Sequence, residues 1–435
     1  MHAPTQRQSH LACMDCGQVY PIDRVIYTCA RCGGLLDVVH DIEAMGGRVT
    51  HATFDDRLGA RDRPYSSGVW RFKELVYPDL LEAHIVTRPE GNTALYEIPR
   101  LAAWAGLERL LLKHEGENPT GSFKDRGMTG GVSQARRLGM ERVACASTGN
   151  TSAALAAYAA LAGMGALVFF QKGQVALGKL AQSIAYGATC VQIDGDFDTA
   201  MRLVQAVCAE FGVYLLNSLN PFRLEGQKSI MFEVMQQLRW QPPDWIVVPG
   251  GNLGNSSAFG KALLELYRLG LISRVPRLAV IQAAGANPLY LGYRDGFKTR
   301  PTVTAQTLAT AIKIGAPVNY AKAVRALRWT GGVVEQVSDQ EIMDAKAQID
   351  AAGVGCEPAS ASALAGARKL VGMGVIDPGA HVVGILTGHV LKDPTAILDY
   401  HTSQIPNLKA IYANRLLTAA PDLESIRRTL DEAGL

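Results

Sequence analysis

The sequence has no long hydrophobic segment. None of its apolar stretches approaches the roughly 20 residues that a membrane-spanning helix needs. The first eleven residues are polar and contain no apolar core of the kind found in secretory signal peptides. From these absences we expect a cytoplasmic protein that does not enter a membrane.

An excess of charge of one sign is also absent. Lys and Arg together number 43 and Asp and Glu number 40, which leaves a formal charge of +3. No run of basic residues is long enough to form a face for nucleic acid, so we expect no nucleic-acid partner. Hydrophobic residues make up 48% of the 435 positions, which is enough to bury one large core or two medium ones.

Cysteine is scarce, and half of it lies in one short segment. Cys13-Met-Asp-Cys16-Gly and Cys29-Ala-Arg-Cys32-Gly form two knuckles, and the glycine after each pair allows backbone N–H groups to turn toward thiolate sulfur. This spacing predicts four zinc ligands in a small zinc-ribbon-like module over residues 1–45. Reduced thiols without metal are the alternative, and a disulfide is the least expected state in the cytoplasm. Strands are expected at residues 18–20 and 25–28.

The other four cysteines lie in mostly apolar surroundings, which is typical of small core residues. They are Cys145, Cys190, Cys208 and Cys356.

Strand and helix patterns alternate through the middle of the chain. Strands are expected at residues 110–113, 142–146, 166–170, 189–193, 214–217, 245–248, 277–282 and 381–386, mostly with helical patterns between them. This alternation predicts an α/β fold with parallel sheets covered by helices on both faces. Residues 46–90 show no strong period and are expected to form a connecting arm that packs on the main body. Residues 401–435 are expected to form a second arm with a helix at 423–432.

One stretch carries the clearest chemical signal. It reads Asn118-Pro-Thr-Gly-Ser-Phe-Lys124-Asp-Arg-Gly, and it places Lys124 at the start of a helix behind a polar turn. A helix N-terminus and partial burial both disfavour a further positive charge, so the pKa of this amine is expected to be lowered. A lysine of that kind can form a Schiff base. The ordinary alternative is an exposed surface lysine.

Four further features suit the binding of an anionic cofactor or substrate. A glycine-rich turn at residues 250–256 joins a strand to a helix, where backbone N–H groups can enclose a phosphate, although many such turns are simple connections. The turn at 147–152 caps a helix. Thr387 follows a strand end at which sites gather in parallel sheets, unless it is a buried threonine bonded to backbone. Arg223, near another helix start, has the forked geometry that grips a phosphate monoester.

Together these stretches resemble the fold type II pyridoxal-phosphate enzymes. The sequence Glu115-Gly-x-Asn118-Pro-Thr-Gly-Ser-Phe-Lys124-Asp-Arg-Gly-Met is closest to that of the threonine synthases within this group. The resemblance implies two parallel-sheet α/β lobes with pyridoxal phosphate between them. It further implies a catalytic domain over residues 91–400, into which a smaller lobe of about residues 125–220 is inserted.

The resemblance also implies roles for individual residues. Lys124 would carry the cofactor and act as the catalytic base, Asn150 would contact the ring hydroxyl oxygen, and Thr387 would contact the ring nitrogen as a partner that makes a milder electron sink than a carboxylate does. The cofactor phosphate would lie in a cup formed by Gly251, Asn252, Leu253, Gly254 and Asn255. The candidates for binding the carboxylate and phosphate of the substrate are Lys113, Ser147, Thr148, Thr151, Ser152, Ser218 and Arg223, with Asn252.

The implied reaction converts O-phospho-L-homoserine and water into L-threonine and phosphate, in a homodimer. Ala94 and Ala316 depart from the family pattern, and Ala316 leaves the substrate open. A paralogue such as cysteate synthase is therefore an alternative, as is a serine/threonine dehydratase, although Arg223 argues against the latter. A more distant alternative is a zinc-ribbon binding protein on an inactive scaffold.

Overall fold

Two separate sheets, one mainly parallel and one entirely parallel, organise the chain. The computed structural model describes residues 9–147, 149–171, 177–194, 197–414 and 416–434. The larger sheet has the strand order β12-β11-β10-β13-β5-β4, and all neighbouring strands are parallel except the edge strand β4, which runs antiparallel to β5. The strands are β4 (Leu95–Glu97), β5 (Arg109–His114), β10 (Trp245–Pro249), β11 (Arg277–Ala283), β12 (Val333–Val337) and β13 (His381–Leu386).

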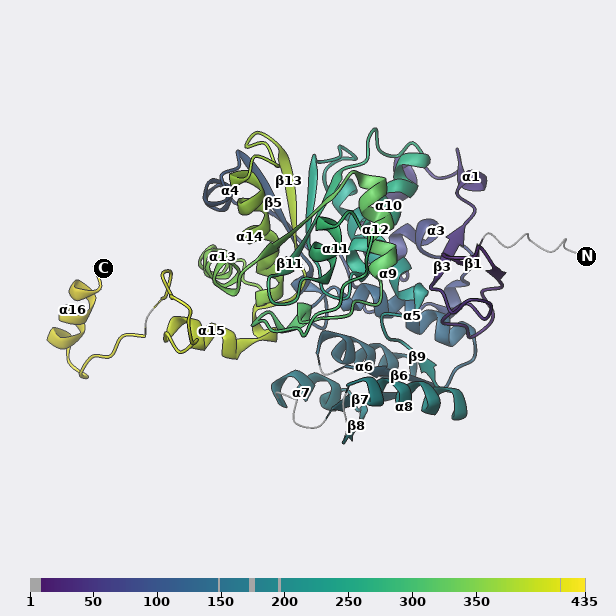
Figure 1. Ribbon diagram of the computed structural model, residues 1–435, viewed down its shortest axis with the longest axis horizontal. Coiled ribbons are helices and arrows are strands. Elements are labelled where there is room, and N and C mark those ends of the chain that lie inside the picture. Colours follow the sequence, from purple (N-terminus) through teal and green to yellow (C-terminus); the bar gives the residue numbers. More distant parts are fainter. Residues whose placement is uncertain (1–8, 148, 172–176, 195–196, 415, 435) are drawn as a thin grey trace, which may run out of the picture.

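The second sheet has the strand order β8-β7-β6-β9 and is parallel throughout. Its strands are β6 (Arg142–Ala146), β7 (Gly165–Gln171), β8 (Thr189–Ile193) and β9 (Tyr214–Leu215), and helices α6 (Asn150–Ala162), α7 (Leu177–Ala185) and α8 (Phe197–Glu210) connect them. Helix α5 (Lys124–Arg137) lies between this sheet and the rest of the body (Figure 1). The alternating pattern of the sequence therefore predicted the parallel α/β fold correctly.

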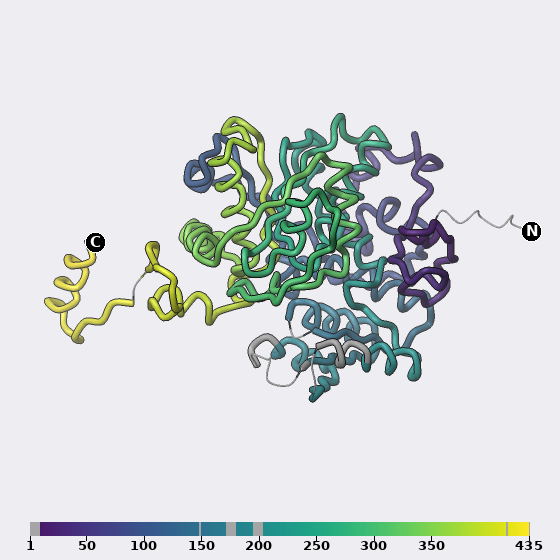
Figure 2. The backbone as a smooth tube through the Cα atoms, viewed as in Figure 1, coloured from purple at the N-terminus to yellow at the C-terminus, as the bar shows by residue number. Residues whose placement is uncertain are grey.

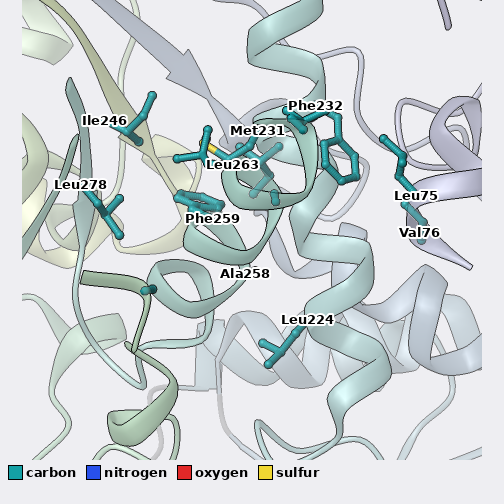
Figure 3. Packing of buried hydrophobic residues seen from close by; sticks show 14 of the residues in the cluster. Leu75, Val76, Leu224, Met231, Phe232, Ile246, Ala258, Phe259, Leu263 and Leu278 are labelled. Atoms are coloured by element: carbon teal, nitrogen blue, oxygen red, sulfur yellow. The ribbon is translucent and has the colours of Figure 1, made fainter. Parts of the chain in front are cut away.

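Helices cover both faces of the larger sheet. One face is covered by α9 (Pro221–Gln237), α10 (Gly254–Arg268) and α12 (Tyr320–Thr330). There Phe259 and Leu263 of α10 lie beside Ile246 and Leu278 of the strands, whereas Phe232 of α9 faces Leu75 (Figure 3). The core on the other face is formed with α4 (Pro99–Ala105), α13 (Asp339–Ala351) and α14 (Pro358–Gly372). Helix α11 (Pro288–Arg294) follows β11. Because helices cover both faces of the sheet, its strands are hydrophobic on both sides.

The N-terminal segment forms a three-stranded antiparallel sheet of order β2-β1-β3. Its strands are β1 (Ser9–Cys13), β2 (Val19–Tyr20) and β3 (Leu36–His40). The strand expected at 18–20 is confirmed, but the one expected at 25–28 is wrong, because that segment makes only an isolated bridge from Thr28 to Leu35. The sheet is built instead from β1 and β3, which the sequence analysis did not predict.

The segment that follows β3 packs on the main body. It contains the short helices α1 (Ile42–Met45), α2 (His51–Asp55), η1 (Trp70–Phe72), α3 (Lys73–Val76) and η2 (Glu82–His84). The side chains of Trp70, Phe72 and Leu75 are fully buried in the same core as α9. The arm is therefore part of the body.

A buried ion pair and a buried hydrogen bond attach the N-terminal module to the body. Asp37 of β3 contacts the Lys322 ammonium of α12 at 2.8 Å, and His40 Nε2 lies 2.8 Å from the Glu225 carboxylate of α9. The pKa of Asp37 is lowered because the cations of Lys322, Lys261 and Arg325 outweigh the cost of its burial. The module thus rests on the same helix, α9, whose first turn contains Arg223.

The C-terminal segment leaves the body (Figures 1 and 2). Helix α15 (Pro394–His401) lies against α13 through Tyr400, whereas α16 (Leu423–Glu432) buries none of its residues. Over the described residues, no helix combines the length and the apolar character that crossing a bilayer requires.

Candidate active site

The lysine loop is held by the backbone of the neighbouring strand. The loop follows β5 and the short helix η3 (Glu115–Glu117), and β5 is paired with β13. The Phe123 N–H donates to the Thr387 carbonyl at 3.0 Å, and the His389 N–H donates to the Gly121 carbonyl at 2.9 Å. The residues just before Lys124 and those around Thr387 therefore form one continuous edge.

Side chains stabilise the loop from within. The Asn118 amide donates to the Glu115 carbonyl and accepts from the Gly91 N–H. Asp125 accepts from both the N–H and the hydroxyl of Thr120 at 2.7 Å. Burial raises the pKa of Asp125 to about 7 despite these bonds.

Lys124 is the first residue of α5, as the sequence predicted. Burial, supported by the nearby Arg223 cation and opposed by the Glu357 carboxylate, lowers the pKa of its amine to about 7. The side chain still keeps part of its surface open, and no described residue accepts a hydrogen bond from its Nζ. A large fraction of this amine is therefore neutral and available near neutral pH.

Arg223 is a buried cation without a described anionic partner. Its side chain is 2% exposed, one Nη atom donates to the Leu216 carbonyl at 3.0 Å, and Nε has no hydrogen-bond partner. Among the described residues no carboxylate forms an ion pair with it, and burial lowers its pKa to about 10. Because a buried charge is costly unless it is paired, this arrangement suits an anion that arrives with a ligand.

The glycine-rich turn before α10 also has unused polar groups. A Cβ at Gly251 would lie 3.0 Å from the Ile312 Cα, so the turn is too tight for a side chain there, and Leu253 adopts the left-handed conformation (φ 63°). The buried Asn255 Oδ1 and Ser256 Oγ in the first turn of α10 have no partner. The Ser256 hydroxyl and the N–H groups of this helix N-terminus can donate to a phosphate, whereas Asn255 Oδ1 is an acceptor.

Asn252 connects this turn to the segment before α9. Its Nδ2 donates to Ser218 Oγ at 3.0 Å, and its Oδ1 accepts from the Val318 N–H at 2.7 Å. Asn319, directly before the first residue of α12, donates from its side-chain amide to the Ser218 carbonyl. Asn252 and Ser218, which were both predicted to bind phosphate, are thus side by side.

The two residues predicted to hold the cofactor ring donate hydrogen bonds to the same carboxylate, that of Glu357. Asn150, the first residue of α6, donates from Nδ2 to the two Glu357 oxygens at 3.0 and 3.3 Å, and Thr387 Oγ1 donates to Glu357 at 3.2 Å. Glu357 was not among the residues predicted for the site. Its Glu-Pro-Ala-Ser-Ala segment is similar to a family segment that lies over the cofactor, but that resemblance assigned no role to the glutamate itself.

The turn predicted to bind a carboxylate is ordered by its own hydroxyls. The Gly149 N–H donates to Ser147 Oγ at 3.2 Å, and Ser152 Oγ donates to the Gly149 carbonyl at 2.8 Å. Thr151 is half-buried in the first turn of α6. Thr148 lies outside the described residues.

Lys113 does not join this group. Its fully buried ammonium donates to the Thr93 carbonyl at 2.7 Å, to Gln237 at 2.9 Å and to the Glu233 carboxylate. Because all three of its N–H donors are used and Glu233 and Gln237 lie at the opposite end of α9 from Arg223, the structure favours a structural role for Lys113.

The four N-terminal cysteines converge. Their sulfur atoms all lie within 4.8 Å of one another, with Cys13 to Cys32 at 3.5 Å and Cys16 to Cys29 at 3.6 Å. A tetrahedral zinc with Zn–S bonds of about 2.3 Å needs sulfur atoms about 3.8 Å apart. Gly17 and Gly33, each directly after a knuckle, have φ values of 70° and 74°, which favour glycine. The geometry of the cluster therefore fits the predicted metal.

Comparison with known proteins identifies the class. The sequence profile described as pyridoxal-phosphate dependent enzyme matches residues 86–388, which include the lysine loop, the glycine-rich turn and Thr387. The chain therefore belongs to the family of pyridoxal-phosphate dependent enzymes.

Within that family, its relatives are threonine synthases. The chain is 47% identical over 392 residues to threonine synthase of Methanosarcina acetivorans, covering 90% of this chain and 94% of that one. It is 47% identical over 388 residues to threonine synthase of Methanocaldococcus jannaschii, covering 89% and 93%. The crystal structure of threonine synthase from Escherichia coli has the same fold, with a TM-score of 0.68 at 18% identity, over 98% of this chain and all of that one.

These comparisons confirm the family, the fold class and the cofactor predicted from the sequence. The structure offers pyridoxal phosphate what it requires: a lysine with a lowered pKa, unpaired polar groups at a helix N-terminus for the phosphate, and side-chain hydrogen-bonding groups on Asn150 and Thr387 for the ring. The residues present therefore fit the cofactor.

Proposed function

We propose that this protein is a threonine synthase, which converts O-phospho-L-homoserine and water into L-threonine and phosphate. The observation that carries the proposal is the buried Arg223 beside Lys124, which forms no ion pair with any carboxylate of the described residues. A pyridoxal-phosphate enzyme whose substrate lacked a second anion would have little reason to maintain that cation at a cost in stability.

Each part of the site has one task in this proposal. Lys124 carries the cofactor, the turn from Gly251 to Asn255 receives its phosphate group, and Asn150 and Thr387 hold its ring. When bound, pyridoxal phosphate supplies an electron sink for the negative charge that develops on the substrate carbons. The turn at 147–152 binds the substrate carboxylate through N–H and hydroxyl groups.

Arg223 binds the substrate phosphate together with Ser218, Asn252 and Thr151. The guanidinium provides the full charge and a forked pair of donors, and the neutral residues orient the remaining oxygens. Because Arg223 is already desolvated in the folded protein, binding of the phosphate ester adds little further cost of removing this cation from water. The same grip favours departure of phosphate from Cγ, because negative charge accumulates on the leaving oxygen.

The Lys124 amine moves the protons. With a pKa near 7 it is neutral often enough to accept protons from Cα and Cβ and acidic enough to return them. Phosphate leaves from Cγ, which gains a proton, and water adds at Cβ. The overall balance is one water consumed and one phosphate released for each threonine.

The test is phosphate release from O-phospho-L-homoserine by the purified protein with pyridoxal phosphate, with the product identified. We expect one threonine for each phosphate, and the exposed-residue control Arg328→Met is expected to match the wild type. Phosphate released with a keto acid in place of threonine would indicate a dehydratase. A yellow protein that releases no phosphate would indicate a paralogue, for which phosphoserine with sulfite is the next substrate. A colourless, inactive protein would indicate a scaffold without catalysis.

We also propose that Cys13, Cys16, Cys29 and Cys32 bind a structural zinc ion. The sulfur distances support this, and the docking of the module on α9 and α12 gives the metal a role in holding the N-terminal segment against the body. Metal analysis of the purified protein should find one zinc per chain.

Finally, we propose a cytoplasmic homodimer, as in the family that the sequence resembles. The exposed apolar residues of the C-terminal arm support a dimer: Leu416 is 90% exposed and Leu423 72%, while Leu391 and Leu398 at the base of the arm are also exposed. A ten-residue helix is not stable alone in water, so α16 needs a surface to cover it. Leu423→Asp should shift the mass measured by light scattering from dimer toward monomer, and Arg427→Ala should not.

A further inference from the structure

The Glu357 carboxylate is the shared acceptor for Asn150 and Thr387. It lies at the start of α14, is 4% exposed, and accepts from Asn150 Nδ2 at 3.0 Å and from Thr387 Oγ1 at 3.2 Å. Asn150 belongs to the four-stranded lobe, whereas Glu357 and Thr387 belong to the six-stranded one. One buried carboxylate therefore determines the hydrogen bonding of both residues assigned to the cofactor ring.

A carboxylate only accepts hydrogen bonds, and this fixes the direction of both contacts. The Asn150 amide must present its NH₂ group to Glu357, which leaves the second hydrogen of that NH₂ group for another acceptor. The Thr387 hydroxyl has one hydrogen, and the contact with Glu357 uses it.

Ser360 makes a second side-chain contact with the Thr387 hydroxyl. Its Oγ accepts from the Gly388 N–H at 2.9 Å and lies 3.0 Å from Thr387 Oγ1. Because the Thr387 hydrogen points to Glu357, the Ser360 hydroxyl donates to Thr387 in this arrangement. Thr387 Oγ1 then has no hydrogen left and can serve any further group only as an acceptor.

We propose that Glu357 is a positioning residue that, through the Thr387 hydroxyl, keeps the cofactor's ring nitrogen protonated. The inference rests on the proposed placement of the ring between Asn150 and Thr387. A hydroxyl that can only accept is a partner for a pyridinium N–H, and the negative carboxylate behind it balances the positive charge. Thr387 alone predicts a milder electron sink, whereas Thr387 backed by Glu357 gives a stronger one.

This arrangement matches the demands of the proposed reaction. Protons leave two successive carbons, so the ring must stabilise more negative charge than in a reaction at Cα alone. Asn150, oriented by the same carboxylate, presents an N–H rather than a carbonyl to the ring oxygen, which stabilises that oxygen as an anion.

The test is the nitrogen-15 NMR shift of ring-labelled pyridoxal phosphate bound to the full-length protein. We expect the pyridinium shift in the wild type and in the surface control Glu108→Gln, and the neutral pyridine shift in Glu357→Gln, because an amide can donate to Thr387 and reverse its hydrogen. A neutral shift in the wild type, or an unchanged shift in Glu357→Gln, would overturn the proposal.

Two further variants separate this role from a general loss of structure. Thr387→Val removes the link and should give the neutral shift, whereas Ser360→Ala leaves the Glu357 contact in place and should keep the pyridinium shift. Circular dichroism confirms folding of each variant. The readout requires cofactor binding but no turnover, so a labelled holoprotein that releases no phosphate would count against the proposed reaction alone. A protein that binds no cofactor would overturn both proposals.

Discussion

Replacing Arg223 by methionine should make the apoprotein more stable and the enzyme far less active. The pKa of the buried guanidinium is about 10, against an ordinary value of about 12.5. That difference corresponds to about 3 kcal/mol by which folding disfavours the charged form. Because the folded pKa of this cation is depressed, the penalty is fully present below pH 10 and disappears as the pH rises toward the unfolded value.

Other contributions reduce the gain but do not reverse it. The variant loses the hydrogen bond to the Leu216 carbonyl, which contributes about 1 kcal/mol, and methionine keeps most of the aliphatic packing. We therefore expect the free energy of unfolding to rise by about 2 kcal/mol and Tm by about 2–4 °C. Calorimetry of the apoprotein at pH 7 measures this directly.

Activity should change in the opposite direction. Two hydrogen bonds from a charged group to the substrate phosphate contribute about 1.5–3 kcal/mol each, so kcat/KM should fall by about 10²- to 10⁴-fold. Steady-state phosphate release gives that ratio.

The matched control is a buried arginine that does have anionic partners. Arg126 contacts Glu115 at 2.6 Å and Glu233 at 3.0 Å, so Arg126→Met leaves the buried Glu115 carboxylate without a cation and should cost about 3–5 kcal/mol. The reasoning fails if Arg223→Met lowers the stability of the apoprotein as Arg126→Met does.

Three other results are expected. Attachment of pyridoxal phosphate to the apoprotein, followed by absorbance, should become faster with rising pH around a midpoint near 7, because the Lys124 amine reacts when it is neutral. Lys124→Ala should show no attachment and no turnover. A midpoint near pH 10 would contradict the argument that burial lowers the pKa of Lys124. Cys32→Ser should lose zinc in metal analysis and lower Tm, whereas the scattered-cysteine control Cys190→Ser should keep the metal. Lys113→Met should lower the free energy of unfolding by about 3–5 kcal/mol, because Glu233 loses one of its buried partners. In the enzyme that still folds, KM for the phosphorylated substrate should stay within about twofold of the wild type. A large rise in KM would instead place Lys113 at the substrate.

Local signals in the sequence predicted many elements closely. The bounds expected for the helix at 423–432 match α16 because the Asp422 side chain caps its first turn by accepting from the Ser425 N–H. Strand β13 was equally clear, as a run of apolar residues between turns. In these places the residues that define an element lie within it or next to it.

The features that local sequence did not reveal depend on partners far away in the chain. Strand β3 is held by Lys322 and Glu225, which the sequence around residue 36 does not reveal. The family resemblance implies that Lys113 contacts the substrate phosphate, which stays a prediction, and the sequence around it does not reveal its buried partner Glu233 at the far end of α9. Glu357 acquires its significance only when α6 and the end of β13 are brought to it. The domain boundaries and the individual roles of the site residues stay predictions.

The backbone bonds between the lysine loop and the end of β13 have a consequence for motion. Lys124 and Thr387 lie on one continuous edge, because Gly121 and Phe123 form backbone hydrogen bonds with His389 and Thr387. Asn150 belongs to the other lobe and reaches this edge through Glu357. If the lobes separate to admit substrate, the two proposed cofactor contacts on this edge keep their spacing while the third, Asn150, withdraws. The lobe movement would then act on the ring oxygen and on the turn at 147–152, and the hydrogen bond from Asn150 to Glu357 would form only when the lobes are closed.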